Sequence, residues 1–108
     1  MKLALMFYDT KLGILEKVQD GYIYTSNIEG EKAMQKRLPD LCVLYDLAGS
    51  NALKTKTLPR QFVDIIKKFS RPDIIEAAGI ASGDGDFEKL VKLASLPTFP
   101  KNFYVMLA

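Results

Sequence analysis

The feature of the sequence with the clearest chemical meaning is a group of positively charged side chains between positions 54 and 71. A single carboxylate, Asp64, lies in the same stretch. Lysines and arginines that converge on one face attract phosphates by counterion release. A solvated helix face is the plainer interpretation of the same spacing. The candidate partner-binding residues are Lys54, Lys56, Arg60, Lys67, Lys68 and Arg71.

Catalytic equipment is sparse. General acid-base or nucleophilic catalysis needs a group whose pKa can be brought near that of the medium, or a nucleophile beside a positioned base. The chain has no histidine and one cysteine, Cys42. Cys42 lies between Leu41 and Val43 in a helix predicted to be buried, where cysteine behaves as a small hydrophobe. We expect a protein that is not an enzyme; the alternative is an enzyme that uses only carboxylates or lysines.

The glycines and acidic residues predict no bound cofactor or metal. Residues 83–86, with the sequence GDGD, superficially resemble a calcium loop, but the other oxygen ligands and the closing glutamate are missing at the required spacing. A helix-capping turn is the better interpretation. The remaining glycines do not form a phosphate-binding fingerprint, which needs several of them at fixed spacing after a strand.

Composition describes an ordinary globular chain of one domain, residues 1–108, with 48% hydrophobic and 26% charged residues. The net charge of +2 is too small to make the whole molecule a polyanion binder. A lone cysteine excludes an internal disulfide and favours a reducing cytoplasm. No apolar run approaches the ~20 residues of a membrane span, so no membrane partner is expected.

The hydrophobic pattern predicts four strands. In the first, Leu3, Leu5 and Phe7 share one face, and the opposite face is also apolar, which indicates a central strand. Asp20-Gly21 predicts a hairpin with a type I′ turn, since glycine accepts the positive φ that this turn needs. The last strand is expected to return to the N-terminal sheet. The predicted strands are 2–8, 13–19, 22–25 and 102–107.

Four to five helices are expected to pack against this sheet, in an α+β fold with an N-terminal three-strand meander and a C-terminal strand. Spacing and caps place them at 26–38, 39–49, 58–69, 73–80 and 86–96. Ser26 with Glu29 predicts a capping box, Thr57 a second cap, and Asp84 or Asp86 a third. The polar segment 50–57 reads as a loop. Helix 58–69 is expected to bury Phe62, Ile65, Ile66 and Phe69.

The order of these elements resembles the start of HipA-type proteins. The carriers of the resemblance are the strand, the turn into LGILEKVQDG with Gly13, the aromatic strand YIYTSN, and the closing DFEKLVKLAS helix followed by NFYVML. The chain departs from the family at two places. After the third strand the family usually has a Ser-Leu-Pro-Leu-like stretch, and this chain has only Leu38-Pro39. Before the last strand the family often has a glycine-rich turn, and this chain has LPTFPK, residues 96–101.

The resemblance implies a function. HipA-type proteins are serine/threonine kinase toxins of bacterial toxin-antitoxin systems, and their catalytic and ATP-binding residues belong to a core that this chain lacks. The chain is therefore similar to a stand-alone, HipS-like N-terminal subdomain, which binds a separately encoded HipA-like kinase and controls it. A DNA-binding antitoxin would be reached through that kinase. The alternative is a small nucleic-acid-binding regulator that uses the basic segment 54–71.

Overall fold

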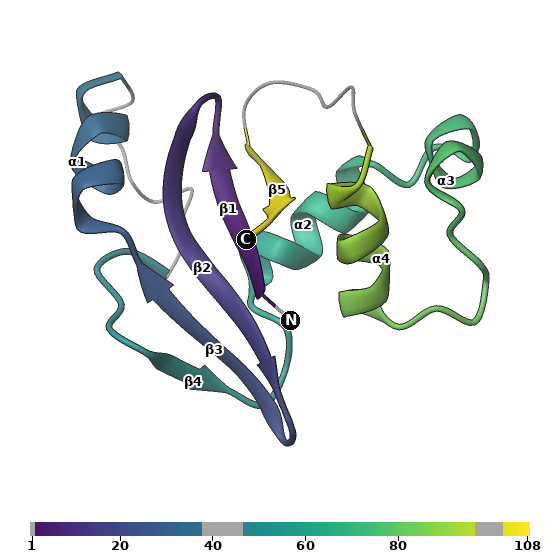
Figure 1. Cartoon of the computed structure of the whole chain (residues 1–108), viewed down its shortest axis with the longest axis horizontal. Helices are drawn as coiled ribbons and strands as arrows, with labels where there is room; N and C mark the ends of the chain where they lie inside the picture. The colour runs from purple at the N-terminus through teal and green to yellow at the C-terminus, as the bar shows by residue number, and fades with distance from the viewer. Residues whose placement is uncertain (1, 38–46, 97–102) are drawn as a thin grey trace.

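The computed structural model describes residues 2–37, 47–96 and 103–108 of the chain. It is an α+β fold built on one antiparallel sheet with strand order β4-β3-β2-β1-β5. Figure 1 shows α1 beside the meander at the left of the view, while α2, α3 and α4 gather at the right. The predicted fold class is confirmed, with one strand more than the sequence pattern indicated.

The N-terminal meander forms as predicted from strands β1 (Lys2–Phe7), β2 (Thr10–Val18) and β3 (Gly21–Ser26). β1 lies inside the sheet between β2 and β5, which explains why both of its faces are apolar. The second strand begins three residues earlier than predicted. Leu5 pairs with Gly13 but Met6 pairs with Lys11, so Leu12 is an extra, fully buried residue that bulges β2.

The β2–β3 hairpin is present, but its turn is shifted from the prediction by one residue. Val18 pairs with Gly21, so the two turn residues are Gln19 and Asp20, and neither has a positive φ. A type I′ turn at Asp20-Gly21 is therefore wrong. Gly21 is instead required by close packing: a Cβ atom there would lie 2.1 Å from the carbonyl oxygen of Thr55.

The predicted loop 50–57 contains the additional strand. β4 (Leu53–Thr55) pairs antiparallel with β3, with Leu53 opposite Tyr24 and Thr55 opposite Tyr22. Ala52, just before it, has a φ of 55°, which turns the chain into the strand. A three-residue polar strand has too short an alternation to be recognised from its sequence; the edge of β3 organises it.

The C-terminal strand β5 (Phe103–Leu107) pairs antiparallel with β1, as expected of a strand that returns to the N-terminal sheet. Leu5 lies opposite Val105, and Phe7 lies opposite Phe103 with ring centroids 5.0 Å apart. The Ala108 amide donates to the Lys2 carbonyl at 3.1 Å. The two ends of the chain are therefore held side by side (Figure 1).

The described helices are α1 (Ile28–Arg37), α2 (Arg60–Lys68), α3 (Pro72–Ala78) and α4 (Asp86–Ala94). Helix α3 ends as predicted at Gly79, in the left-handed conformation with φ 73°. The predicted helix 39–49, with Cys42, lies almost entirely outside the described residues. At its end Gly49, with a φ of 70°, has the left-handed conformation expected of a residue after a helix.

The predicted side-chain caps are wrong at three helices. Asn27, rather than Ser26, caps α1, and its Oδ1 accepts from the Gly30 amide at 3.2 Å. Helix α2 starts after Pro59 and α4 after Gly85, both without a capping side chain. Thr57 and Asp84 instead bond elsewhere, since the Thr57 carbonyl accepts from the Thr55 hydroxyl at 2.8 Å and Asp84 binds Lys92.

One hydrophobic core joins the sheet to the helices. Leu3, Leu5 and Leu15 from the sheet pack with Phe62 and Leu90 from α2 and α4. Phe62 and Ile65 of α2 and Phe69 at its C-terminal end are buried as predicted, and Ile66 is half-buried. The core thus fixes α2 beside the sheet with its charged side chains outward.

Candidate functional site: a cleft between β4 and α2

A cleft of about 690 Å³ separates the edge strand β4 from helix α2. Leu53 and Thr55 of β4 form one wall. Arg60, Val63, Asp64 and Lys67 of α2 form the other. Leu47, Leu58 and Pro59 complete the lining with Thr57. The cleft therefore combines apolar side chains with two cations and one carboxylate.

The amphipathic pattern of α2 places its charged residues along the cleft. Arg60, Asp64 and Lys67 follow one another at spacings of four and three, so they lie on one helix face. Phe62 and Ile65 occupy the opposite side, at exposed fractions of 0% and 2%, and anchor the helix in the core. The burial of one face therefore determines which charges face β4.

The structure divides the six predicted partner-binding residues. Arg60 and Lys67 are brought together on the cleft wall. Lys54 lies in β4 between Leu53 and Thr55, so its side chain points to the opposite face of the sheet, where its Nζ lies 3.7 Å from the Asp20 carboxylate. The six cations therefore do not converge on one face, contrary to the expectation from the sequence.

The other three predicted residues lie in α2 or next to it in the chain, but outside the cleft lining. Lys56 is exposed directly after β4. The Nζ of Lys68 lies 5.5 Å from the centre of the Phe69 ring. Arg71, before α3, donates to the Asp73 carboxylate at 2.9 Å. Arg71 is thus already engaged with an acidic neighbour.

The charge around the cleft is positive. Of the ion pairs within the described ranges, none involves Lys56 or Lys67. Both side chains are exposed, so they are available to an anionic group brought in by a partner. Asp64 is the one carboxylate in the described lining.

A buried carboxylate that sequence reasoning missed holds the floor of the cleft. Glu31 of α1 is 6% exposed, and its two oxygens accept from the Gly49 amide at 2.9 and 3.1 Å. The Ser26 hydroxyl accepts from the Ser50 amide and donates to the Leu47 carbonyl. These bonds position Leu47 at the bottom of the cleft. Their partners are distant in sequence, so no local pattern reveals them.

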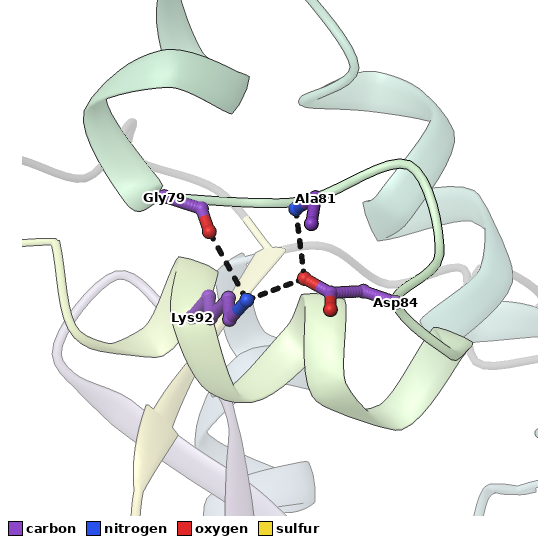
Figure 2. Close-up of polar contacts among 4 residues, drawn as sticks. All are labelled: Gly79, Ala81, Asp84 and Lys92. Atoms are coloured by element: carbon purple, nitrogen blue, oxygen red, sulfur yellow. Dashed lines mark hydrogen bonds and ion pairs between the residues drawn. The ribbon is translucent and has the colours of Figure 1, made fainter.

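A second polar cluster supports the helices rather than the cleft. Lys92 of α4 contacts both the Gly79 carbonyl, at 3.0 Å, and the Asp84 carboxylate, at 2.5 Å. Asp84 also accepts from the Ala81 amide at 2.9 Å. Figure 2 shows how these contacts tie the turn after α3 to α4. These bonds explain how the GDGD segment acts as a structural turn. Asp84 pairs with a lysine side chain, however, and does not cap a helix N-terminus.

Within residues 2–37, 47–96 and 103–108, no group of three or more metal-binding side chains comes together. No helix in these ranges has the length and hydrophobicity to cross a membrane. No family model matches the chain, and neither a curated protein nor a solved structure matches it.

Proposed function

We propose that this chain is a non-catalytic interaction protein of a toxin-antitoxin system, which binds and controls a separately encoded HipA-like serine/threonine kinase in the cytoplasm. In this proposal the chain acts as a HipS-like N-terminal subdomain. It contacts a DNA-binding antitoxin only through the kinase. No cofactor or metal takes part.

The observation that carries the proposal is the pairing of β5 with β1. The resemblance to the HipA N-terminal subdomain requires a meander whose sheet is completed by the C-terminal strand after the last helix. The register from Leu3 opposite Leu107 to Phe7 opposite Phe103 has this arrangement. A resemblance in composition alone would not predict that the C-terminal strand pairs with β1 of the N-terminal meander.

The distribution of charge favours a protein partner over a nucleic acid. A phosphate backbone is best bound by cations that converge on one surface. Here Lys54 points away from the face that carries Arg60 and Lys67, and Arg71 is paired with Asp73. Helix α3, the second helix of a would-be helix-turn-helix, has Asp73 and Glu76 but no basic residue.

A phosphorylation assay tests the proposal. The HipA-like kinase encoded nearest to this chain would be purified and its autophosphorylation rate measured with and without an equimolar amount of the chain. We expect the rate to change with a saturable dependence on the chain's concentration. Incubation of the chain alone with ATP is expected to release no phosphate.

A matched control uses the chain with Phe62 replaced by Ala, which should be unfolded and therefore inactive in the same assay. A rate that is identical with the parent chain, the unfolded variant and buffer would contradict the proposed function. Phosphate transfer by the chain alone would contradict its assignment as a non-catalytic protein.

A further inference from the structure

The outer edge of β4 has backbone groups that the sheet does not use. β4 stands last in the strand order, next to β3. A Cβ at Gly21 would lie 2.1 Å from the Thr55 carbonyl oxygen, so that carbonyl points toward β3. On β3 the Ser26 amide points toward the β4 side of the strand, where it donates to the Ser50 carbonyl at 2.8 Å.

Strand alternation then determines the direction of the intervening residue. Backbone groups of successive strand residues point to opposite neighbours. Since the backbone groups of Thr55 and Leu53 point toward β3, the amide and carbonyl of Lys54 point outward, away from the sheet. An exposed strand edge of this kind accepts an added strand from another chain. The edge is short, so it offers room for a few residues of an extended segment.

The cleft lies beside this edge in the right place for the side chains of an added strand. Leu53 and Thr55 project from one face of β4 into the cleft. A strand paired with Lys54 would project every second side chain over the same face, between β4 and α2. Leu58 and Val63 would contact an apolar side chain there, and Lys67 would contact a carboxylate.

We infer that the kinase partner docks by adding an extended acidic segment to the edge of β4, with alternate side chains seated in the cleft between β4 and α2. The inference rests on the proposed function for the identity of the partner. The occupant is acidic because Lys67 lines the cleft and Lys56 follows β4, and neither forms an ion pair within the described part of the chain. Backbone pairing supplies binding, and the two cations supply selection for carboxylates.

The first test compares two neighbouring lysines of α2. Lys67→Glu places a carboxylate in the cleft wall, while Lys68→Glu makes the same change of net charge outside the lining. Both residues lie in the last turn of α2, so effects on the helix dipole are matched. In a calorimetric titration with the kinase, we expect Lys67→Glu to weaken binding about tenfold or more, as for loss of a close interfacial charge pair, and Lys68→Glu less than threefold.

The second test blocks the edge. Lys54→Pro removes the outward amide and places a ring against any added strand, whereas Lys54→Ala removes the same side chain and leaves the amide in place. Both variants lose the contact with Asp20, so this contribution is matched. We expect binding to fall at least tenfold for the proline variant and to change little for the alanine variant. A melting curve measured for each variant establishes that it folds.

A defined probe makes the test independent of the kinase. The amide resonances of Leu53–Thr55, Val63 and Lys67 would be followed by NMR during addition of a blocked hexapeptide of alternating Glu and Val. We expect saturable shifts at these amides. A Lys-Val hexapeptide and a single-stranded oligonucleotide serve as comparisons and should leave the amides unshifted.

The outcomes separate the docking surface from the proposed function. If the kinase binds the parent and all four variants equally, the cleft inference is wrong and the proposed function stands. If the kinase does not bind but the acidic peptide shifts the cleft amides, the identity of the partner is wrong and the edge site stands. Shifts caused by the oligonucleotide or by the Lys-Val peptide, with none from the Glu-Val peptide, would overturn the acidic occupant.

Discussion

Tyr24 illustrates how a single side chain depends on its neighbours in this sheet. Its ring is fully buried and lies across Gly13, where a Cβ would come within 2.2 Å of the phenol oxygen. Burial raises the pKa of Tyr24, the Glu31 carboxylate raises it further, and the Ser26 hydroxyl lowers it in part. Within the described residues, the phenol oxygen has no hydrogen-bond partner. Tyr24 is thus a structural residue of the core.

This environment predicts alkaline sensitivity. The pKa of Tyr24 is raised above the ordinary value of about 10. The stability that this group contributes is therefore fully present below that pH and is lost as the pH rises through the folded-state pKa. Tyr24→Phe should remove part of this loss. At pH 7 it should change the free energy of unfolding by less than about 1 kcal/mol, since no bonded hydroxyl is removed.

Urea unfolding at pH 7 and at pH 11 measures the effect, with Tyr8→Phe as the exposed control. Equal loss of stability at alkaline pH in the parent and in Tyr24→Phe would show that another group controls the transition.

Asp84 predicts the opposite dependence on pH. The hydrogen bond from Lys92 lowers the pKa of Asp84 most, with help from the Ala81 amide. A lowered folded-state pKa contributes stability above the unfolded value of about 3.9, and this contribution is lost as the pH falls through the folded-state pKa. Asp84→Asn should therefore lower the melting temperature at pH 7 and have a smaller effect at pH 3.

The matched control is Asp73→Asn, which removes an exposed carboxylate that pairs with Arg71. An Asp84→Asn variant that melts with the parent at both pH values would contradict the structural role of the cluster in Figure 2.

At the scale of elements, α2 is the helix that connects core and cleft. Phe62 is fully buried at its centre, whereas Ile66 on the same apolar stripe is half-buried. Phe62→Ala should cost ~3–5 kcal/mol of unfolding free energy through the cavity it leaves. Ile66→Ala should cost less because fewer of its contacts are lost. Circular dichroism checks that Phe62→Ala is unfolded, and chemical denaturation measures the loss for Ile66→Ala; a folded Phe62→Ala or an unfolded Ile66→Ala would indicate that α2 packs in a different rotation.

The sequence was sufficient for elements whose own pattern is long enough. The alternating β1 and β5, the amphipathic α2 and the glycine-terminated α3 were all predicted. β4 was missed because three residues carry no periodicity and their pairing is determined by β3. The α1 cap was misplaced because Ser26 and Asn27 both suit the position, and the distant backbone at Leu47 and Ser50 binds Ser26.

The same limit applied to the candidate site. Arg60 and Lys67 were predicted as part of one basic segment, and the structure places both on the cleft wall. Lys54 was grouped with them because the segment 50–57 was interpreted as a loop, and a loop has no alternation of faces. Because residues 53–55 form a strand, the Lys54 side chain must point to the opposite face of the sheet from Leu53 and Thr55. Secondary structure thus decides which cations can act together.

At the scale of the whole molecule, one antiparallel sheet holds the cleft in place. β5 pairs with β1 and forms one edge of the sheet, and the bond from Ala108 to Lys2 holds the two ends of the chain together. The opposite edge, β4, keeps an outward-facing backbone beside α2. A rigid sheet whose β4 edge lies beside the cleft is suited to holding a partner, because little conformational freedom is lost on binding.

The central claim is that this chain forms a stable complex with a separately encoded HipA-like kinase. Light scattering during size-exclusion chromatography of the co-expressed pair tests it most directly. The account predicts one peak that contains both chains, with a mass 12.1 kDa above that of the kinase for each bound copy. Two separate peaks at the masses of the isolated proteins, at concentrations well above micromolar, would contradict it.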